Sequence, residues 1–304
     1  MIQKVTMIGM GAVGAMVGQA LQKVLGKENL ECICEGERKA RYEKDGILIN
    51  GVRQDFNYVT PENVQVSDFV IIATKNLQMD QVLVQIKNAV GPDTTILSLL
   101  NGIQSEKELE EVYGKEKVIY GFIIGLSSVH EKNNIICTDT GTIVYGENDN
   151  SKSERIIAIG KLFDEAGQKS HNPEDIHLEQ WKKYLMNVTC NTVTPLCRAP
   201  SGTFKNDVLC DVVRQAAKEV IAVANAEGVA LEDEHMEVNI RIMDSIDPRG
   251  KTSMYQDIEA RRKTENAWFC GTVVKLGAKH GIATPTCALL EKLITITEAG
   301  WEYN

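Results

Sequence analysis

The 304-residue sequence has no apolar run of the length that spans a bilayer, and it has no dense basic run. Its 33 lysines and arginines against 42 aspartates and glutamates give a net charge of −9, which argues against nucleic acid or an anionic membrane surface as a partner. The first residues lead directly into a strand-like segment, so no secretory signal is expected. We therefore predict a cytoplasmic globular protein with a small-molecule substrate, in which local positive charge holds any anionic ligand.

The eight cysteines include no CxxC pair. Their spacing also lacks the ligand pattern of a zinc site, so we expect no metal. We interpret them as reduced, buried, small apolar side chains, as is usual in a cytoplasmic protein.

The most informative segment is a glycine-rich turn close to the N-terminus. It consists of Gly9, Met10, Gly11, Ala12, Val13 and Gly14. A short apolar strand pattern precedes it, a helical pattern to residue 25 follows it, and a second strand pattern over 30–34 ends at Glu35. This context is typical of a dinucleotide-binding turn. Gly9 permits the tight turn, Gly11 lets a pyrophosphate approach the backbone, and Gly14 lets helix and strand pack closely. The helix N-terminus offers unpaired N–H groups to the phosphates.

Strand and helix patterns alternate up to about residue 150, which predicts a mostly parallel, doubly wound sheet. The expected elements are a hairpin of 47–50 with 54–60, strands over 68–73 and 94–99, and helices over 78–90, 106–113 and 153–166. In open sheets of this kind, ligands bind at the carboxyl ends of the strands. Lys75 and Asn101 follow two such ends, so we expect them to converge on the glycine turn. Taken singly, each residue could instead belong to an ordinary solvent-exposed loop or turn.

Beyond residue 173 nearly all patterns are helical, over 175–193, 205–227, 233–244, 254–279 and 286–299. The predicted fold class is therefore α/β, with an N-terminal Rossmann-type doubly wound sheet followed by an all-α C-terminal domain. We place a dinucleotide-binding domain over 1–168 and a helical substrate and catalytic domain over 169–304. The apolar faces of the long C-terminal helices would suit either a homodimer or an internal core.

Three polar residues recur at helical spacing in the first of these helices: Lys183, Asn187 and Asn191. At about 100° per residue they form one slowly drifting stripe. Asparagine is unfavourable inside a helix, so two of them beside a lysine indicate a purpose. A lysine in a cleft can donate a proton to a developing alkoxide, and carboxamides can hold a substrate. The alternative is a solvated helix face.

A second polar segment contains Ser253 at a predicted helix start and Glu265 at the start of the next helix. Ser253 could bind a substrate carboxylate. A buried Glu265 beside Lys183 would keep the lysine charged and oriented. Alone, this segment also fits an exposed charged helix.

Together these motifs resemble the ketopantoate reductase (2-dehydropantoate 2-reductase) family over essentially the whole chain. The residues that carry the resemblance are the glycine turn, Lys75, Asn101-Gly102, Trp181-Lys182-Lys183 with Asn187 and Asn191, Ser253-Met254-Tyr255-Gln256-Asp257, and Thr264-Glu265. The resemblance implies a Rossmann domain, a helical domain and an active site between them. It also implies NADPH-dependent reduction of 2-dehydropantoate to (R)-pantoate, a step of pantothenate biosynthesis.

The resemblance also implies roles for particular residues. The lysine that matches Lys183 is the general acid, and the glutamate that matches Glu265 supports it and the substrate. The residues that match Asn101, Asn187, Asn191 and Ser253 line the substrate site. We place Lys75 and Asn101 beside the cofactor as well.

One departure from the family concerns the cofactor. Where the family usually has an arginine that holds the 2′-phosphate of NADPH, this chain has Glu35. A glutamate there suits the free 2′-hydroxyl of NAD and repels a phosphate, although Arg38 and Lys39 follow closely and could compensate. The sequence therefore leans towards NAD without excluding NADP.

This departure leaves three functions open. The first is a ketopantoate reductase. The second is an NAD-dependent D-2-hydroxyacid dehydrogenase of the same family that acts on another branched or aromatic 2-keto acid. The third is a non-catalytic nicotinamide-binding sensor.

Overall fold

The computed structural model describes residues 2–131 and 134–303, and its contacts divide the chain into two compact units, Met1–Ile176 and His177–Asn304. This division lies several residues beyond the proposed domain boundary at 168/169. The reason is that the short strand β10 (Ser170–His171) still pairs with β9 (Asn134–Gly146) and so belongs to the sheet of the first unit.

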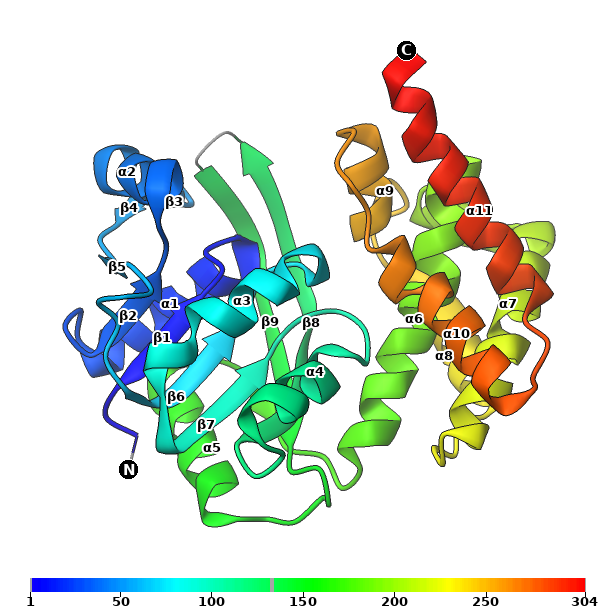
Figure 1. Ribbon diagram of the computed structural model, residues 1–304. Helices are drawn as coiled ribbons and strands as arrows, with labels where there is room; N and C mark the ends of the chain where they lie inside the picture. Colours follow the sequence, from blue (N-terminus) through cyan, green and yellow to red (C-terminus); the bar gives the residue numbers. More distant parts are fainter. Residues whose placement is uncertain (1, 132–133, 304) are drawn as a thin grey trace. The chain divides into compact units, whose positions relative to one another are not determined.

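In the described part of the first unit, ten strands form one sheet in the order β4-β3-β9-β8-β7-β6-β1-β2-β5, with β10 beside β9 (Figure 1). The strands of the parallel half are β1 (Val5–Ile8), β2 (Leu30–Ile33), β5 (Asn57–Val59), β6 (Ser67–Ile72), β7 (Val90–Ser98) and β8 (Val118–Glu131). The long pair β8–β9 is antiparallel, as is the short pair β3–β4. The predicted mostly parallel, doubly wound sheet is therefore confirmed.

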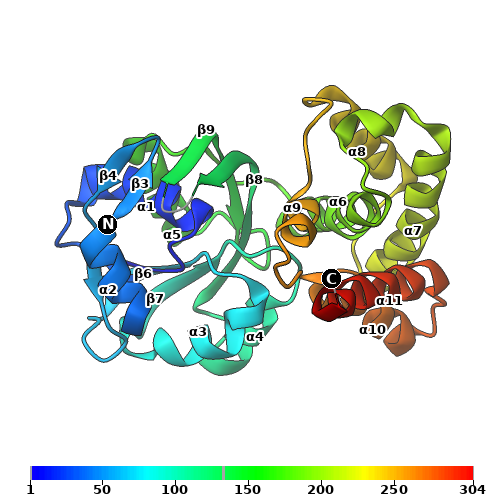
Figure 2. The ribbon, with the colours of Figure 1, turned by 90° about the horizontal axis from the view of Figure 1, so that it is seen from above.

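Alternate strand residues pack under helices on opposite faces of this sheet (Figure 2). Met7 and Phe69 belong to the core that contains residues of α1 (Ala12–Leu25) and α5 (Glu154–Ala166). Ile8 and Val70 belong to the core that contains residues of α3 (Met79–Gln85) and α4 (Ser105–Tyr113). Since neighbouring residues of a strand point to opposite faces, helices must cover both sides.

Two local predictions for the first unit are wrong. The hairpin partner of β3 (Ile47–Ile49) is β4 (Val52–Gln54), because Asn50 and Gly51 both have positive φ and close a two-residue turn. Residues 57–59 instead form β5, which pairs with β2 at the other edge of the sheet. The helix expected over 78–90 is also shorter. After α3 a 3₁₀ turn follows over Lys87–Ala89, and Val90 already begins β7.

The regular elements described in the second unit are helices. They are α6 (Ile176–Cys197, which begins at the end of the first unit), α7 (Asp207–Ala226), α8 (Asp233–Ser245), α9 (Ser253–Glu259), α10 (Cys270–His280) and α11 (Pro285–Ala299), with short 3₁₀ turns between them. The continuous helix predicted over 254–279 is wrong. The chain leaves α9 after Glu259, passes Arg261 at φ +50° and re-enters a 3₁₀ turn, η4 (Asn266–Trp268), before α10. This break places Glu265 in a turn.

The prediction that the cysteines are reduced and buried holds for most of them. All eight are free, and six are buried, whereas Cys137 is half-buried and Cys197 is exposed. Among the helices of the described residues, none has the length and apolar character needed to cross a membrane.

Candidate functional site

The turn between β1 and α1 requires glycine at two positions. Gly9 has φ +93°, and a Cβ there would lie 2.5 Å from the carbonyl carbon of Ala73. A Cβ on Gly14 would lie 1.8 Å from the carbonyl oxygen of Gly9, far inside any nonbonded contact. A Cβ on Gly11, by contrast, would meet no atom of the described chain within 4 Å. The backbone at Gly11 therefore borders open space.

This open backbone continues into the start of α1. Gly11 is the residue before the helix and has no side chain with which to cap it, and the first helical residues are Ala12 and Val13. The first N–H groups of a helix have no acceptor within the helix, and they carry the positive end of its dipole. Such a helix start is suited to a phosphate group.

The loops that follow β6 and β7 meet at the same edge of the sheet. Asn76 is 3% exposed and donates Nδ2 to the carbonyl oxygen of Asn101 at 2.7 Å, while Ala73 and Thr74 lie against Gly9. Lys75 and Asn101 are both partly buried on these loops. The three stretches singled out from the sequence thus come together, although neither Lys75 nor Asn101 lines the cavity that opens beside the glycine turn.

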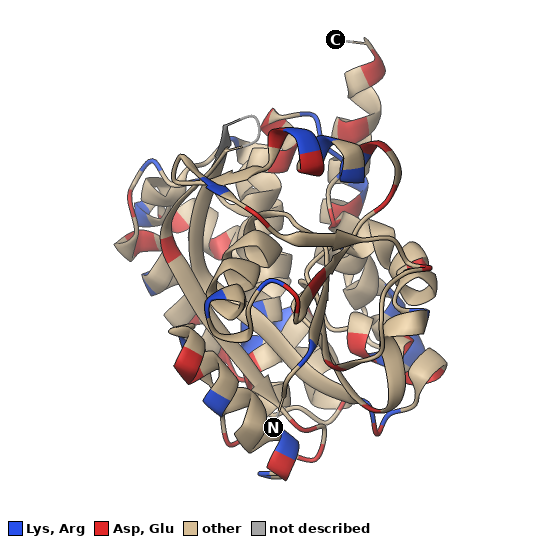
Figure 3. Ribbon diagram, turned by 90° about the vertical axis from the view of Figure 1, so that its left-hand side faces the viewer, with Lys and Arg blue, Asp and Glu red and all other residues tan. Residues whose placement is uncertain are grey.

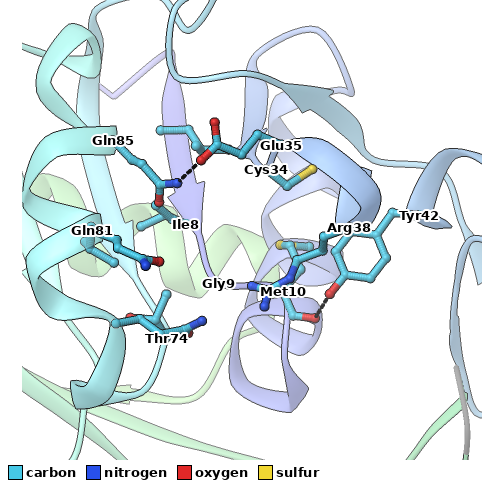
Figure 4. Close-up of a pocket in the computed structure, with 13 residues that line it drawn as sticks. Ile8, Gly9, Met10, Cys34, Glu35, Arg38, Tyr42, Thr74, Gln81 and Gln85 are labelled. Carbon is cyan, nitrogen blue, oxygen red and sulfur yellow. Dashed lines mark hydrogen bonds between the residues drawn. The ribbon is translucent and has the colours of Figure 1, made fainter. Parts of the chain in front are cut away.

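That cavity has a volume of about 220 Å³ and lies between the ends of β1 and β2 and one face of α3 (Figure 4). Its lining residues are Ile8, Gly9, Met10, Ile33, Cys34, Glu35, Arg38, Tyr42, Thr74, Gln78, Gln81, Val82 and Gln85. Burial raises the pKa of the Cys34 thiol to about 11, so this side chain is neutral at ordinary pH. The Thr74 hydroxyl oxygen is buried and has no hydrogen-bond partner in the described part of the chain. The cavity therefore offers an unused polar group as well as open backbone.

Glu35 lies at one side of the cavity and Arg38 at another. Glu35 accepts a hydrogen bond on Oε1 from Gln85 Nε2 at 2.6 Å, whereas Arg38 extends beside the Gly9–Met10 turn (Figure 4). Arg38 forms no ion pair within residues 2–131 and 134–303, but Lys39 is paired with Glu43 one helical turn along α2 (Gly36–Asp45). Charges of both signs alternate along α2 (Figure 3). Among the described residues that line the cavity, Arg38 is the one with a cationic side chain.

Most residues of the cavity wall formed by α3 are not among the predicted site residues. Gln81, Val82 and Gln85 of α3 follow Gln78, the last residue of the preceding 3₁₀ turn, by three, four and seven residues, and this spacing places them on one side. That spacing was visible in the sequence, and the position of this helix shortly after β6 and Lys75 was the further signal. Tyr42, which donates to the carbonyl oxygen of Met10 at 3.5 Å, had no comparable signal.

In the second unit, three of the predicted residues form one hydrogen-bonded cluster. Asn191 donates Nδ2 to Asn187 Oδ1 at 3.2 Å and to Ser253 Oγ at 3.4 Å. Asn187 and Asn191 are 6% and 8% exposed, and Asn187 Nδ2 is buried with no hydrogen-bond partner among the described residues. The start of α9 is fixed to α6 by a 2.9 Å hydrogen bond between the Thr194 and Thr252 hydroxyls. The cluster thus presents an unused N–H donor.

Glu265 lies in the turn before η4 and is 7% exposed, while Lys183 is half-buried on α6. The turn is tied to α6 by the residue after Lys183, because Tyr184 Oη donates to the carbonyl oxygen of Phe269 at 2.7 Å. It is tied to α11 by Glu298 Oε1, which accepts from both the backbone N–H of Thr264 at 2.9 Å and its hydroxyl at 2.6 Å. The turn is therefore held from two helices.

The first unit has the architecture of Rossmann-type dinucleotide-binding domains. Family models agree with this and extend over both units. A model described as ketopantoate reductase PanE/ApbA matches residues 5–150, and the model of its C-terminal part matches residues 175–298. The chain belongs to the ketopantoate reductase family, as its motifs predicted. It is therefore an oxidoreductase of a family that acts on CH–OH groups.

Individual relatives cover nearly the whole chain. The 2-dehydropantoate 2-reductase of Streptococcus pyogenes serotype M3 is 26% identical over 96% of both chains. The crystal structure of 2-dehydropantoate 2-reductase from Geobacter metallireducens GS-15 matches with a TM-score of 0.85 at 27% identity, over 96% of this chain and 99% of that one. A D-mandelate dehydrogenase structure with NADH and anilino(oxo)acetate matches with a TM-score of 0.89 at 24% identity, over 98% and 99%. The last similarity supports the fold.

The glycine geometry predicts different effects for two similar substitutions, one on stability and one on dinucleotide binding. Gly14→Ala should destabilise the protein by about 3 kcal/mol or more, because the new Cβ collides with backbone that cannot move aside. Gly11→Ala should change the free energy of unfolding by no more than about 1 kcal/mol but should weaken dinucleotide binding, since its Cβ enters the open space. Urea unfolding and dinucleotide titration of both variants test this. Equal stabilities would contradict the close contact at Gly14.

The Glu298 clamp predicts a pH-dependent contribution to stability. Burial raises the pKa of Glu298, but the hydrogen bonds from Lys263 and Thr264 outweigh it and hold the pKa below its ordinary value. A lowered carboxyl pKa stabilises the folded state above the ordinary value of about 4.3, and this stabilisation is lost as the pH falls through the lowered pKa. Glu298→Gln should therefore cost about 1–3 kcal/mol at pH 7 and less at low pH.

Urea unfolding of wild type and Glu298→Gln at pH 7 and at about pH 3.5 measures this difference. The exposed Glu302 on the following turn provides a matched control, and Glu302→Gln should leave the stability unchanged at both values. A cost of Glu298→Gln that is the same at both pH values would contradict the role of the carboxylate charge.

Proposed function

We propose that this protein is an NADH-preferring reductase of 2-keto acids, with 2-dehydropantoate as the first candidate substrate and (R)-pantoate as its product. The observation that carries the cofactor preference is Glu35, which lines the cavity beside the glycine turn with its carboxylate held by Gln85. The choice of substrate is supported by relatives named 2-dehydropantoate 2-reductases, which match this chain over nearly their whole length.

The residues of the first unit fit a nicotinamide dinucleotide. In this proposal the open backbone at Gly11 and the start of α1 receive the pyrophosphate, together with Arg38. Glu35 accepts a hydrogen bond from the free ribose 2′-hydroxyl and repels a 2′-phosphate. Lys39 offers little compensation for that repulsion, because Glu43 already neutralises it. The bound cofactor supplies the hydride.

The residues of the second unit supply the acid and the substrate contacts in this proposal. Lys183 protonates the ketone oxygen as the keto carbon is reduced, and Glu265 keeps the lysine charged and oriented. Asn187 has a buried N–H that is free to donate to a substrate oxygen, and Asn191 holds the Asn187 carboxamide in place. Ser253, together with these amides and Asn101, receives the substrate carboxylate. Lys75 stands beside cofactor and substrate.

A second candidate is an NAD-dependent D-2-hydroxyacid dehydrogenase that acts on a larger branched or aromatic 2-keto acid. Glu35 favours this candidate, because it suits NADH, whereas the resemblance to ketopantoate reductases implies NADPH. The D-mandelate dehydrogenase that shares the fold is described with NADH. A nicotinamide-binding sensor is a weaker candidate, because Lys183, Asn187 and Glu265 are all present.

We also propose a cytoplasmic homodimer. A ketopantoate reductase from Staphylococcus aureus that shares the fold is described as dimeric. In this chain α11 carries Leu289 and Ile296 with 57% and 66% of their surfaces exposed. Large apolar side chains on one helix are a common feature of subunit contacts.

The loss of NADH or NADPH absorbance with 2-dehydropantoate, and with a panel of branched and aromatic 2-keto acids, tests the reaction. We expect turnover with 2-dehydropantoate, with a kcat/KM at least about tenfold higher for NADH than for NADPH, which corresponds to a charge repulsion at Glu35 of about 1.4 kcal/mol or more. Turnover with another keto acid alone would favour the second candidate. Cofactor binding without turnover on any of them would favour the sensor.

Lys183→Met should lower kcat by at least about 100-fold, because it removes the proton donor, while NADH should still bind. The neighbouring Lys182 gives a matched control, since it is paired with Glu179 at 2.7 Å and has no part in the proposed chemistry. Lys182→Met should keep kcat within about twofold, as surface substitutions usually do. Steady-state kinetics and NADH titration measure both. Undiminished turnover of Lys183→Met would overturn the assignment of the acid, whichever substrate is used.

A further inference from the structure

The wall of the cavity that faces Glu35 is one face of α3, and a single side chain of that face bonds to the carboxylate. Gln85 Nε2 donates to Glu35 Oε1 at 2.6 Å, across 50 residues of sequence (Figure 4). Both side chains line the cavity. Since a hydrogen bond to a charged group is among the stronger ones in proteins, this contact restricts an otherwise exposed glutamate to one orientation.

We infer that Gln85 is a positioning residue for the choice of dinucleotide: it holds Glu35 so that the carboxylate accepts a free ribose 2′-hydroxyl and excludes a 2′-phosphate. This inference rests on the proposed function, and it adds a residue to which the family resemblance assigns no role. Gln85 need not touch the ribose itself, because it acts through Glu35.

The geometry leaves the second carboxylate oxygen for the ligand. Within residues 2–131 and 134–303, Gln85 is the hydrogen-bond partner of the Glu35 carboxylate, and it occupies Oε1. Oε2 therefore retains its acceptor capacity, which matches a hydroxyl donor. A phosphate has no proton to donate at neutral pH and would bring its negative charge against the carboxylate. A glutamate free to rotate could swing away from a phosphate, whereas one bonded to Gln85 cannot do so without losing that bond.

No cation of the described chain neutralises Glu35. Lys39 is paired with Glu43, and Arg38 is drawn beside the glycine turn rather than beside Glu35 (Figure 4). The amide of Gln85 is neutral, so it orients the carboxylate and leaves its charge in place. An arginine or lysine at position 85 would orient it equally well but would cancel the repulsion on which selection depends.

The test compares Gln85→Leu with Gln81→Leu in the full-length protein. Gln81 lines the same cavity from the same helix but makes no hydrogen bond to Glu35. Dissociation constants for NADH, NADPH and 2′-deoxy-NADH are measured by nicotinamide fluorescence without keto acid. Wild type should bind NADH more tightly than both other dinucleotides. Gln85→Leu should reduce each of these two ratios by about three- to tenfold, and Gln81→Leu should leave them unchanged.

A second measurement separates positioning from a change in the shape of the cavity. In a Glu35→Gln background, Gln85→Leu should no longer alter either ratio, because the residue through which it acts has lost its charge. The inference is overturned if Gln85→Leu weakens all three dinucleotides by one common factor, if Gln81→Leu changes the ratios equally, or if the effect persists in the Glu35→Gln background.

Failure of the proposed function would look different. Wild type would then bind NADPH at least as tightly as NADH, before any substitution is made, and this result would overturn both the NADH preference and the role of Gln85. A wild-type preference for NADH that survives Gln85→Leu would overturn the role of Gln85 alone.

Discussion

The carbonyl oxygen of Gly9 occupies the place where any side chain at position 14 would have to begin, 1.8 Å from that Cβ position. This contact brings α1 down onto the end of β1, while the positive φ of Gly9 brings the same turn against Ala73. β1, α1 and the end of β6 are thereby held close together at the carboxyl ends of the strands. Next to this close contact the backbone at Gly11, which carries no side chain, borders open space.

Much of this could be predicted from the sequence, because glycine spacing and strand periodicity are local signals. The alternation of strands and helices fixes which faces are buried, and Gly9, Gly11 and Gly14 each have a distinct conformational task. The second strand of the first hairpin could not be located in this way. The strand character of residues 54–60 fits a hairpin with residues 47–50 equally well. Only the pairing of Asn57–Val59 with Leu30–Ile33 shows that they belong to the opposite edge of the sheet. Such pairing is a tertiary choice.

The helical unit shows the same limit. The continuous polar and apolar pattern over 254–279 favours a helix, but Glu298, which lies far along the chain, accepts two hydrogen bonds from Thr264 and stabilises a turn there instead. The stripe of Lys183, Asn187 and Asn191 was visible from its spacing. The sequence could not show how these amides pair, because that depends on how the helices pack. Asn191 donates to Asn187 and Ser253, and the side-chain N–H of Asn187 has no hydrogen-bond partner among the described residues.

In the proposed function, an acidic chain binds an anionic dinucleotide and rejects NADPH, so its negative charge must not repel NADH as well. Backbone N–H groups and Arg38 at the glycine turn can attract the pyrophosphate without a cluster of lysines. In this proposal Glu35 acts a short distance away, at the ribose position where NADH and NADPH differ. Pairing Lys39 with Glu43, and bonding Glu35 to the neutral Gln85, keeps that one negative charge uncancelled. The proposed preference for NADH thus depends on which charges are neutralised, and the net charge of the chain has little bearing on it.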